Sequence, residues 1–224
     1  MDKFDLVIFD CDGVLVDSER ITNSVFAEML NEMGLPVTLE DMFDTFVGKS
    51  MATCLEIIQQ KLGKPVPDNF VIEYRQRTNK ALEENLKPVK GIHEVLAKLK
   101  LPCCVASNGV QEMIRIKLGI TGLSRYFEKK IFSITEVARG KPYPDIFLYA
   151  AKKMEVQPKR CVVVEDTPTG VKAGFTAGMT VFGYAEISHP GQLREAGASV
   201  VFNDMKLLPN LLKQHEHSNQ SHPR

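Results

Sequence analysis

The stretch LVIFDCDGV at residues 6–14 decides the fold class and carries a candidate reaction site. Its first four residues are apolar, which is typical of a strand buried in a parallel sheet. Asp10 and Asp12 follow at the carboxyl end of that strand, the edge where open α/β sheets hold their reactive groups. A carboxylate there can act as a nucleophile, a metal ligand or a general acid–base. For this stretch alone, two turn-capping aspartates beside Gly13 are an equal alternative.

Three further segments carry polar groups of the kind that phosphoryl transfer needs. Two of them follow apolar runs at 102–106 and 161–164, which predict strands, and the third precedes a helical segment at 145–152. Their polar members are Ser107, Asn108, Lys141, Glu165 and Asp166. Together with the first stretch they supply two carboxylate pairs, a hydroxyl group and a cation, which can hold a metal ion and a phosphate against a nucleophile.

The chain changes character after its first strand. Over residues 16–88 apolar residues recur at helical spacing without strands, whereas strands and helices alternate again further on. That alternation predicts an α/β fold, a Rossmann-like parallel sheet core into which an all-helical domain is inserted. We expect the core to comprise residues 1–15 and 89–214, and the helical domain residues 16–88. The polar, patternless segment 215–224 is expected to be disordered.

Taken in order, the four polar segments resemble the motifs of the haloacid dehalogenase-like hydrolases. The matching positions are Asp10 and Asp12 in the first motif, Ser107 in the second, Lys141 in the third, and Glu165 and Asp166 in the fourth. The resemblance covers nearly the whole chain apart from the polar tail. It is strongest to the phosphatases and β-phosphoglucomutases that carry a small helical cap domain after the first motif, and it implies that residues 16–88 form such a cap.

The resemblance implies a magnesium-dependent mechanism through an aspartyl phosphate. Asp10 would attack phosphorus, while Asp12 would protonate the leaving oxygen and later accept a proton from water. The Mg²⁺ ion would be held by Asp10, by the backbone carbonyl of Asp12 and by Asp166, with Glu165 acting around that metal site. Bound there, Mg²⁺ would offset the repulsion between a carboxylate and a phosphate dianion.

The phosphate itself is expected to contact Ser107, Asn108 and Lys141, of which Ser107 and Lys141 also belong to the predicted catalytic set. A strand-end hydroxyl and nearby N–H groups bind phosphate oxygens, and a lysine neutralises charge. The alternatives are that Ser107 only caps the next helix and that Lys141 is an ordinary surface lysine. The place of Lys141 in the third motif favours the functional interpretation.

In the helical domain, Gly48 and Lys49 fall where the family has a substrate-facing loop. Lys49 could contact a hydroxyl group, a carboxylate or a second phosphate of the substrate. A solvated lysine beside a helix that begins at Ser50 is an equal alternative. Arg75 and Arg77 are weaker candidates, since one of them could simply lie on a solvated helix face.

Composition narrows the partners and the compartment. The 28 basic and 28 acidic residues balance, which gives no indication of a nucleic-acid or anionic-membrane partner. No apolar stretch approaches the length of a transmembrane helix, and the first residues lead directly into a strand without a signal peptide. We therefore expect a cytoplasmic monomer whose partner is a small phosphorylated metabolite.

A phosphatase and a sugar-phosphate mutase would share every core residue named above. The mutases carry a histidine early in the first cap helix, and the corresponding residue here is Thr22, which cannot act as an acid–base group near neutral pH. The sequence therefore favours a phosphatase of small phosphorylated metabolites, with sugar phosphates as the expected class and a β-phosphoglucomutase-like isomerase as the alternative. A non-enzymatic phospho-accepting switch is disfavoured, because its acidic pair would precede the accepting aspartate. Dehalogenase chemistry is disfavoured as well, because it needs neither a second carboxylate such as Asp12 nor magnesium.

Overall fold

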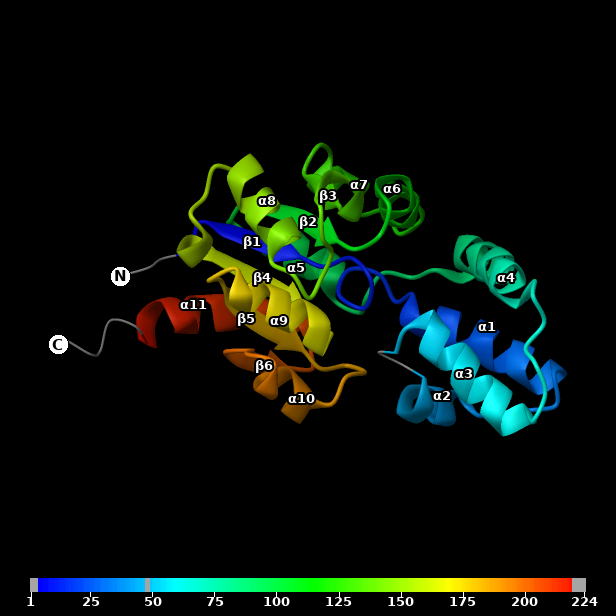
Figure 1. Cartoon of the computed structure of the whole chain (residues 1–224). Helices are drawn as coiled ribbons and strands as arrows, with labels where there is room; N and C mark the ends of the chain where they lie inside the picture. The colour runs from blue at the N-terminus through cyan, green and yellow to red at the C-terminus, as the bar shows by residue number, and fades with distance from the viewer. Residues whose placement is uncertain (1–3, 47–48, 219–224) are drawn as a thin grey trace. The chain divides into compact units, whose positions relative to one another are not determined.

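The computed structural model describes residues 4–46 and 49–218 and divides the chain into two compact units (Figure 1). One unit comprises the residues up to Asp17 and from Lys87 onward, and the other comprises Ser18–Leu86. The predicted boundaries differ from these by two residues on each side. Val16 pairs with Pro88 in an isolated antiparallel bridge, and the Asp17 N–H donates to the Lys87 carbonyl over 2.9 Å. The two segments that connect the units therefore stay with the first unit.

Within the described residues of the first unit, six strands form one parallel sheet in the order β3-β2-β1-β4-β5-β6. The strands are β1 (Leu6–Phe9), β2 (Cys103–Ser107), β3 (Ile131–Ser133), β4 (Cys161–Glu165), β5 (Thr180–Tyr184) and β6 (Val200–Phe202). The predicted α/β class with a parallel, Rossmann-like sheet is confirmed. Because β1 is central and lies between β2 and β4, the polar ends of these three strands meet at one edge.

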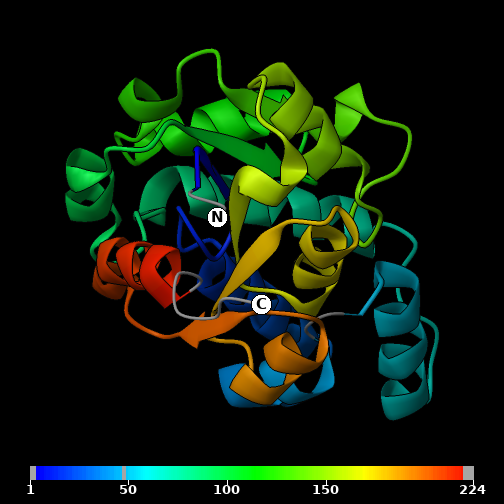
Figure 2. The ribbon, with the colours of Figure 1, turned by 90° about the vertical axis from the view of Figure 1, so that its left-hand side faces the viewer.

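Helices cover both faces of this sheet, as expected for strands that are apolar on both sides. They are α5 (Ile92–Lys98), α6 (Gln111–Ile120), α7 (Ser124–Phe127), α8 (Asp145–Lys153), α9 (Pro168–Thr176), α10 (Pro190–Glu195) and α11 (Leu208–Ser218), with short 3₁₀ turns η1 (Ile134–Glu136), η2 (Pro158–Arg160) and η3 (Met205–Leu207). Ile8 lies in a core cluster with residues of α8, α9 and α10. The neighbouring Phe9 packs edge-on against Phe127 of α7. In Figure 2, α9 and α11 lie on opposite sides of the sheet.

The second unit contains α1 (Glu19–Glu32), α2 (Leu39–Thr45), α3 (Met51–Leu62) and α4 (Phe70–Asn85). The ring of Phe26 on α1 is the centre of its core and makes edge contacts with Phe46, Phe70 and Tyr74 at centroid distances of 5.0–5.6 Å. The predicted start of α3 is confirmed, since the Ser50 hydroxyl accepts from the Thr53 N–H. Aromatic packing and capped helix ends together hold this small unit.

The C-terminal segment is ordered further than expected. Helix α11 continues to Ser218, and the ring of His215 packs at 5.5 Å from that of Phe4 and 5.6 Å from that of Phe182. The expected start of the tail at residue 215 therefore falls inside this helix, whose apolar contacts outweigh its polar composition. Residues 219–224 lie outside the described residues. Over residues 4–46 and 49–218, no helix has the length and apolar character needed to cross a membrane.

The central strand gives a direct test of the sheet core. Ile8 is fully buried, so Ile8→Ala should lower the free energy of unfolding by about 2–5 kcal/mol, through lost apolar burial and the cavity left behind. Ile116→Ala removes the same atoms from the exposed side of α6, so it should change the free energy of unfolding by less than about 0.5 kcal/mol. Urea unfolding of both variants measures the difference, and equal losses would contradict the strand assignment.

Candidate active site

The described structure brings the core motif residues to one edge of the sheet. Asp10 directly follows β1, Ser107 is the last residue of β2, and Glu165 is the last residue of β4. Asp166 comes next in the chain, and Lys141 reaches the same edge from the loop before α8. Four separate segments thus converge, as the strand-end rule predicted.

Lys141 is the cation at the centre of this edge. Its ammonium nitrogen lies 2.6 Å from Oδ1 of Asp10 and 2.5 Å from Oε1 of Glu165, and its side chain is only 5% exposed. Asn108 fixes the loop, because its Oδ1 accepts from the Lys141 N–H over 2.9 Å. The interpretation of Lys141 as an ordinary surface lysine is therefore wrong. Asn108, predicted to bind phosphate, contacts the backbone of Lys141 in this structure.

The charges of this group shift one another's titration. Burial is the largest influence on the pKa of Asp10 and raises it. The charge of Lys141 lowers this pKa, whereas repulsion by Glu165 and Asp12 raises it further. The resulting pKa of Asp10 is about 7. Burial alone would lower the pKa of Lys141, but attraction by Asp10 and Glu165 outweighs it and raises that pKa. Lys141 is therefore a cation throughout the neutral range.

Three of the carboxylates fit a hard divalent metal ion. Asp10, Glu165 and Asp166 are buried and offer oxygen atoms that all lie within 4.8 Å of one another. Carboxylate oxygens are the ligands that Mg²⁺ and Ca²⁺ prefer. Lys141 compensates only part of the charge of three carboxylates, so a divalent cation suits this edge electrostatically. This donor set contains three of the four predicted metal residues.

Glu165 is held rigidly at the start of α9. Its Oε2 accepts from the N–H groups of Asp166 and Thr167 and from the Thr167 hydroxyl over 3.1–3.2 Å. The Thr167 hydroxyl in turn accepts from the Gly170 N–H, so Thr167 is the N-cap of α9. A Cβ atom at Gly170 would overlap the Glu165 carboxylate. Because Gly170 has no side chain, the Glu165 carboxylate can lie directly against the backbone of α9.

Asp12, the fourth predicted metal residue, has a different partner for its carboxylate. Its Oδ1 lies 2.5 Å from the ammonium nitrogen of Lys117 on α6. Burial alone would lower the pKa of Lys117, but the charge of Asp12 outweighs it and raises that pKa. Lys117 was missed in the sequence interpretation. The available signal was a lysine at an apolar-periodic position, three residues after Ile114 and one before Leu118.

The turn that carries Asp12 depends on Gly13. Its φ angle of +74° lies in the left-handed region that favours glycine. A Cβ atom at Gly13 would also overlap the Asp166 carboxylate. Gly13 therefore sets the direction of the chain after Asp12 and allows the first motif to approach the fourth closely.

Ser107 is buried at the end of β2, and its hydroxyl accepts from the Gly109 N–H over 3.0 Å. The alternative that Ser107 caps the next helix is wrong, because the N-cap of α6 is Val110. The Ser107 hydroxyl retains its own proton as a donor, which is what a phosphate oxygen would need.

The helical unit holds its own polar pocket, with a volume of about 210 Å³. Its lining residues are Glu19, Thr22, Asn23, Phe26, Phe46, Lys49, Met51, Cys54 and Tyr74. The Lys49 ammonium donates to the Thr45 carbonyl over 2.5 Å. The predicted residue Gly48 lies outside the described residues. Arg77 forms ion pairs with Glu32 and Glu73, so it acts within the unit, and Arg75 is exposed.

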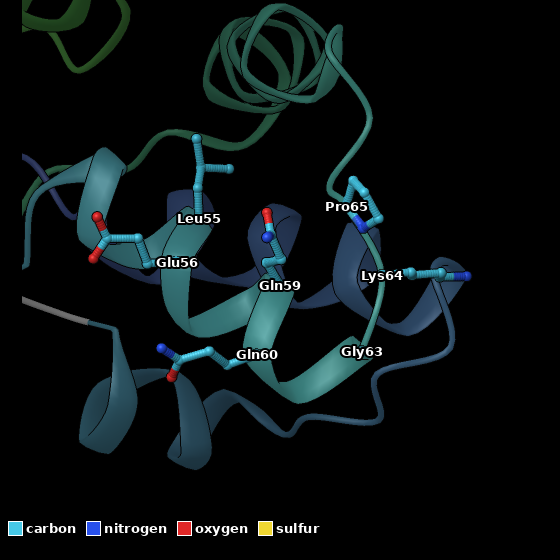
Figure 3. Close-up of a pocket in the computed structure, with 7 residues that line it drawn as sticks. All are labelled: Leu55, Glu56, Gln59, Gln60, Gly63, Lys64 and Pro65. Carbon is cyan, nitrogen blue, oxygen red and sulfur yellow. The ribbon is translucent and has the colours of Figure 1, made fainter.

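A larger hollow of about 460 Å³ lies along α3, and Figure 3 shows the side chains that line it. Of its seven lining residues, Leu55 is half-buried and the other six are exposed. It contains neither a carboxylate cluster nor a predicted site residue. The chemistry of the candidate site is therefore at the sheet edge and not in this hollow.

Comparison with known proteins agrees with this geometry. The family model described as haloacid dehalogenase-like hydrolase matches residues 7–184, which include all four motifs. The chain belongs to this family. The predicted family, and with it a hydrolase, is confirmed.

Two relatives and one solved structure match over nearly the whole length of both chains. A 6-phosphogluconate phosphatase of Escherichia coli K12 is 30% identical over 214 residues, covering 95% of this chain and 96% of that protein. A phosphorylated carbohydrates phosphatase of Thermotoga maritima is also 30% identical over 214 residues, covering 93% and 98%. A haloacid dehalogenase family hydrolase of Deinococcus radiodurans R1, solved with bound phosphate and sodium, superposes with a TM-score of 0.87 at 31% identity, covering 96% of this chain and 98% of that one.

Replacement of two helical glycines tests the close packing of Glu165. Alanine favours a helix over glycine by up to about 1 kcal/mol, so Gly119→Ala on α6, where there is room, should leave the protein equally or more stable. Gly170→Ala on α9 should instead destabilise it by about 1–3 kcal/mol, because the Glu165 carboxylate loses its hydrogen bonds. Thermal unfolding of both variants gives the comparison. A stabilised Gly170→Ala variant would contradict the described position of Glu165.

Proposed function

We propose that this protein is a magnesium-dependent phosphatase of small phosphorylated metabolites, with sugar phosphates as its substrate class. The observation that carries the proposal is the buried Lys141 ammonium between Asp10 and Glu165, next to Asp166. This arrangement suits a nucleophilic carboxylate that must accept a phosphate dianion. The named relatives, which act on phosphorylated carbohydrates, support the same substrate class.

In the first step, a carboxylate oxygen of Asp10 attacks phosphorus in line with the leaving oxygen. The bond between phosphorus and that oxygen breaks, and the leaving alkoxide takes the proton of the Asp12 carboxyl group to become an alcohol. Lys141 and the Ser107 hydroxyl neutralise and orient the phosphate oxygens. The products of this step are the free alcohol, an aspartyl phosphate at Asp10 and an ionised Asp12.

In the second step, a water molecule attacks phosphorus and passes its proton to Asp12. The bond between phosphorus and the Asp10 oxygen breaks, which releases inorganic phosphate and restores both aspartates. Asp12 thus carries one proton out and one proton back in each turnover. The sum of the two steps is hydrolysis of a phosphate monoester.

Asp10, Asp166 and the backbone carbonyl of Asp12 would hold the Mg²⁺ ion, and Glu165 would hold Lys141 beside it. Bound there, Mg²⁺ supplies positive charge that lets the Asp10 carboxylate approach the phosphate and fixes the phosphoryl group in place. The residues next to Glu165 fix the direction of its side chain. The hydrogen bonds from Asp166 and Thr167 to Glu165 keep that carboxylate directed at Lys141.

The pocket within the helical unit is itself proposed to bind polar groups of a small metabolite. Glu19 offers a hydrogen-bond acceptor, Asn23 an amide and Lys49 a cation. Aromatic walls from Phe26 and Tyr74 limit its size. Such a lining suits a polyol with a carboxylate or second anionic group.

Removal of the proposed nucleophile tests the mechanism. Asp10→Asn should reduce phosphate release by at least about 10⁴-fold, since the amide cannot attack phosphorus. The fold should be retained, because the amide fills the same volume; circular dichroism and thermal unfolding check this. Retention of more than a few per cent of wild-type turnover would overturn the aspartyl-phosphate mechanism.

Phosphate release from a panel of sugar phosphates and other metabolite phosphates tests the function directly. We expect release with Mg²⁺, loss with chelator and recovery on readdition of Mg²⁺, because the three carboxylates repel a phosphate dianion when no metal is bound. β-Glucose 1-phosphate should yield inorganic phosphate. Conversion of that compound to glucose 6-phosphate would identify a mutase instead, and a long-lived phosphoprotein without turnover would identify a switch.

A further inference from the structure

Lys117 lies on the inward face of α6, where the neighbouring residues of the same face are uncharged. Ile114 and Leu118 are buried, and Thr121 just beyond the helix end is buried as well, whereas Ile116 is exposed. The side chain of Lys117 on this face is 14% exposed. Removing an ammonium group from water costs free energy unless an opposite charge compensates for it. The position of Lys117 therefore calls for a specific partner.

That partner is Asp12, which is 105 residues away in the chain. The ammonium nitrogen and Oδ1 of the carboxylate are 2.5 Å apart. The backbone around Asp12 is fixed by its own turn, since the Leu15 and Val16 N–H groups both donate to the Cys11 carbonyl over 2.9 Å and 3.1 Å. The turn thus holds the main chain of Asp12, and Lys117 holds its carboxylate.

The two aspartates of the first motif have different lysines. Asp10 pairs with Lys141 and belongs to the carboxylate group that fits a metal ion. In the part of the chain that the structure describes, the oxygen cluster around Asp10 does not include the Asp12 carboxylate. The second lysine therefore fixes a carboxylate outside the metal-binding group.

From this arrangement we infer that Lys117 is a positioning residue for Asp12. Its ammonium group donates to Oδ1 and directs the carboxyl group, and the proton carried by the other oxygen goes to the leaving alkoxide. The inference rests on the proposed phosphatase function and adds a residue that the four motifs do not contain. General acid catalysis needs its donor within hydrogen-bond reach of the leaving oxygen. A carboxyl group on a rotatable side chain meets that need only when a neighbour restrains it, and Lys117 supplies the restraint.

The dependence on the leaving group distinguishes this role from simple support of the fold. A sugar alkoxide is a strong base and must be protonated as the bond to phosphorus breaks. A p-nitrophenolate leaves without a proton. Loss of a positioned general acid therefore slows hydrolysis of a sugar phosphate and spares hydrolysis of p-nitrophenyl phosphate, whereas structural damage slows both equally.

The test compares kcat/KM of Lys117→Met for the best sugar phosphate of the panel and for p-nitrophenyl phosphate. This ratio reports the steps up to formation of the aspartyl phosphate, so the later proton transfer to Asp12 does not enter it. We expect a loss of about 10²-fold or more for the sugar phosphate, because general acid catalysis contributes about 10²–10⁴-fold. For p-nitrophenyl phosphate we expect a loss of less than about tenfold. Lys117→Arg, which keeps the cation, should restore most of the difference.

The matched control is Lys152→Met on the exposed face of α8, which should leave both values unchanged. Equal losses of Lys117→Met on both substrates would overturn the inference and show a structural role. If Lys117→Met does not fold, Lys117→Gln gives the same comparison, since it keeps a hydrogen-bond donor without the charge. If the wild-type protein hydrolyses neither substrate, the proposed function fails, and that result is distinct from failure of the role of Lys117.

Discussion

The ion pairs of one buried ammonium group with two carboxylates are the constraint on which this site depends. Lys141 lies 2.6 Å from Asp10 and 2.5 Å from Glu165, in a place that water hardly reaches. The parallel sheet brings β1 and β4 side by side, so the acidic residues at their ends are forced together. Repulsion between charges that are out of water is strong, and each buried charge also loses its hydration. The positive charge of Lys141 offsets part of both costs. A divalent metal ion would offset the negative charge that remains.

Backbone packing fixes the carboxylates as firmly as the charges do. At Gly13 and Gly170 a Cβ atom would overlap a carboxylate, that of Asp166 in one case and that of Glu165 in the other. Oxygen atoms that touch the main chain have little freedom to turn, so the donor set is directed before any metal binds. That is the condition under which an electrostatic site needs little reorganisation during the reaction.

Much of the core could be predicted because its signals are local. An apolar run followed by Asp10 or Glu165 identifies a strand end, and the parallel topology then places those ends at one edge. Thr167 followed by Pro168 is likewise a local signal for the start of a helix, and α9 begins there. The three carboxylates and Lys141 were therefore found without the structure.

The remaining features depend on distances that the sequence does not contain. Lys117 lies in an ordinary amphipathic helix, and its partner is 105 residues away, so only the register of α6 against the first motif identifies the pair. Asn108 likewise contacts the backbone of Lys141 across 33 residues. The end of α11 was placed too early because the segment is polar, yet the ring of His215 packs on Phe4 and Phe182. In each case a tertiary contact decides what composition alone cannot.

Two aspartates that are separated by a single residue must do different work, and the structure gives them different partners. A nucleophile has to be ionised and pressed against the phosphate, which suits Asp10 between a lysine and a metal-binding group. A proton carrier has to gain and lose a proton in every cycle, which is difficult for a carboxylate bound directly to a metal ion. Among the described residues, the Asp12 carboxylate is paired with Lys117 and is not part of the oxygen cluster around Asp10. The short spacing of the first motif is workable because one turn and two lysines give its two carboxylates separate surroundings.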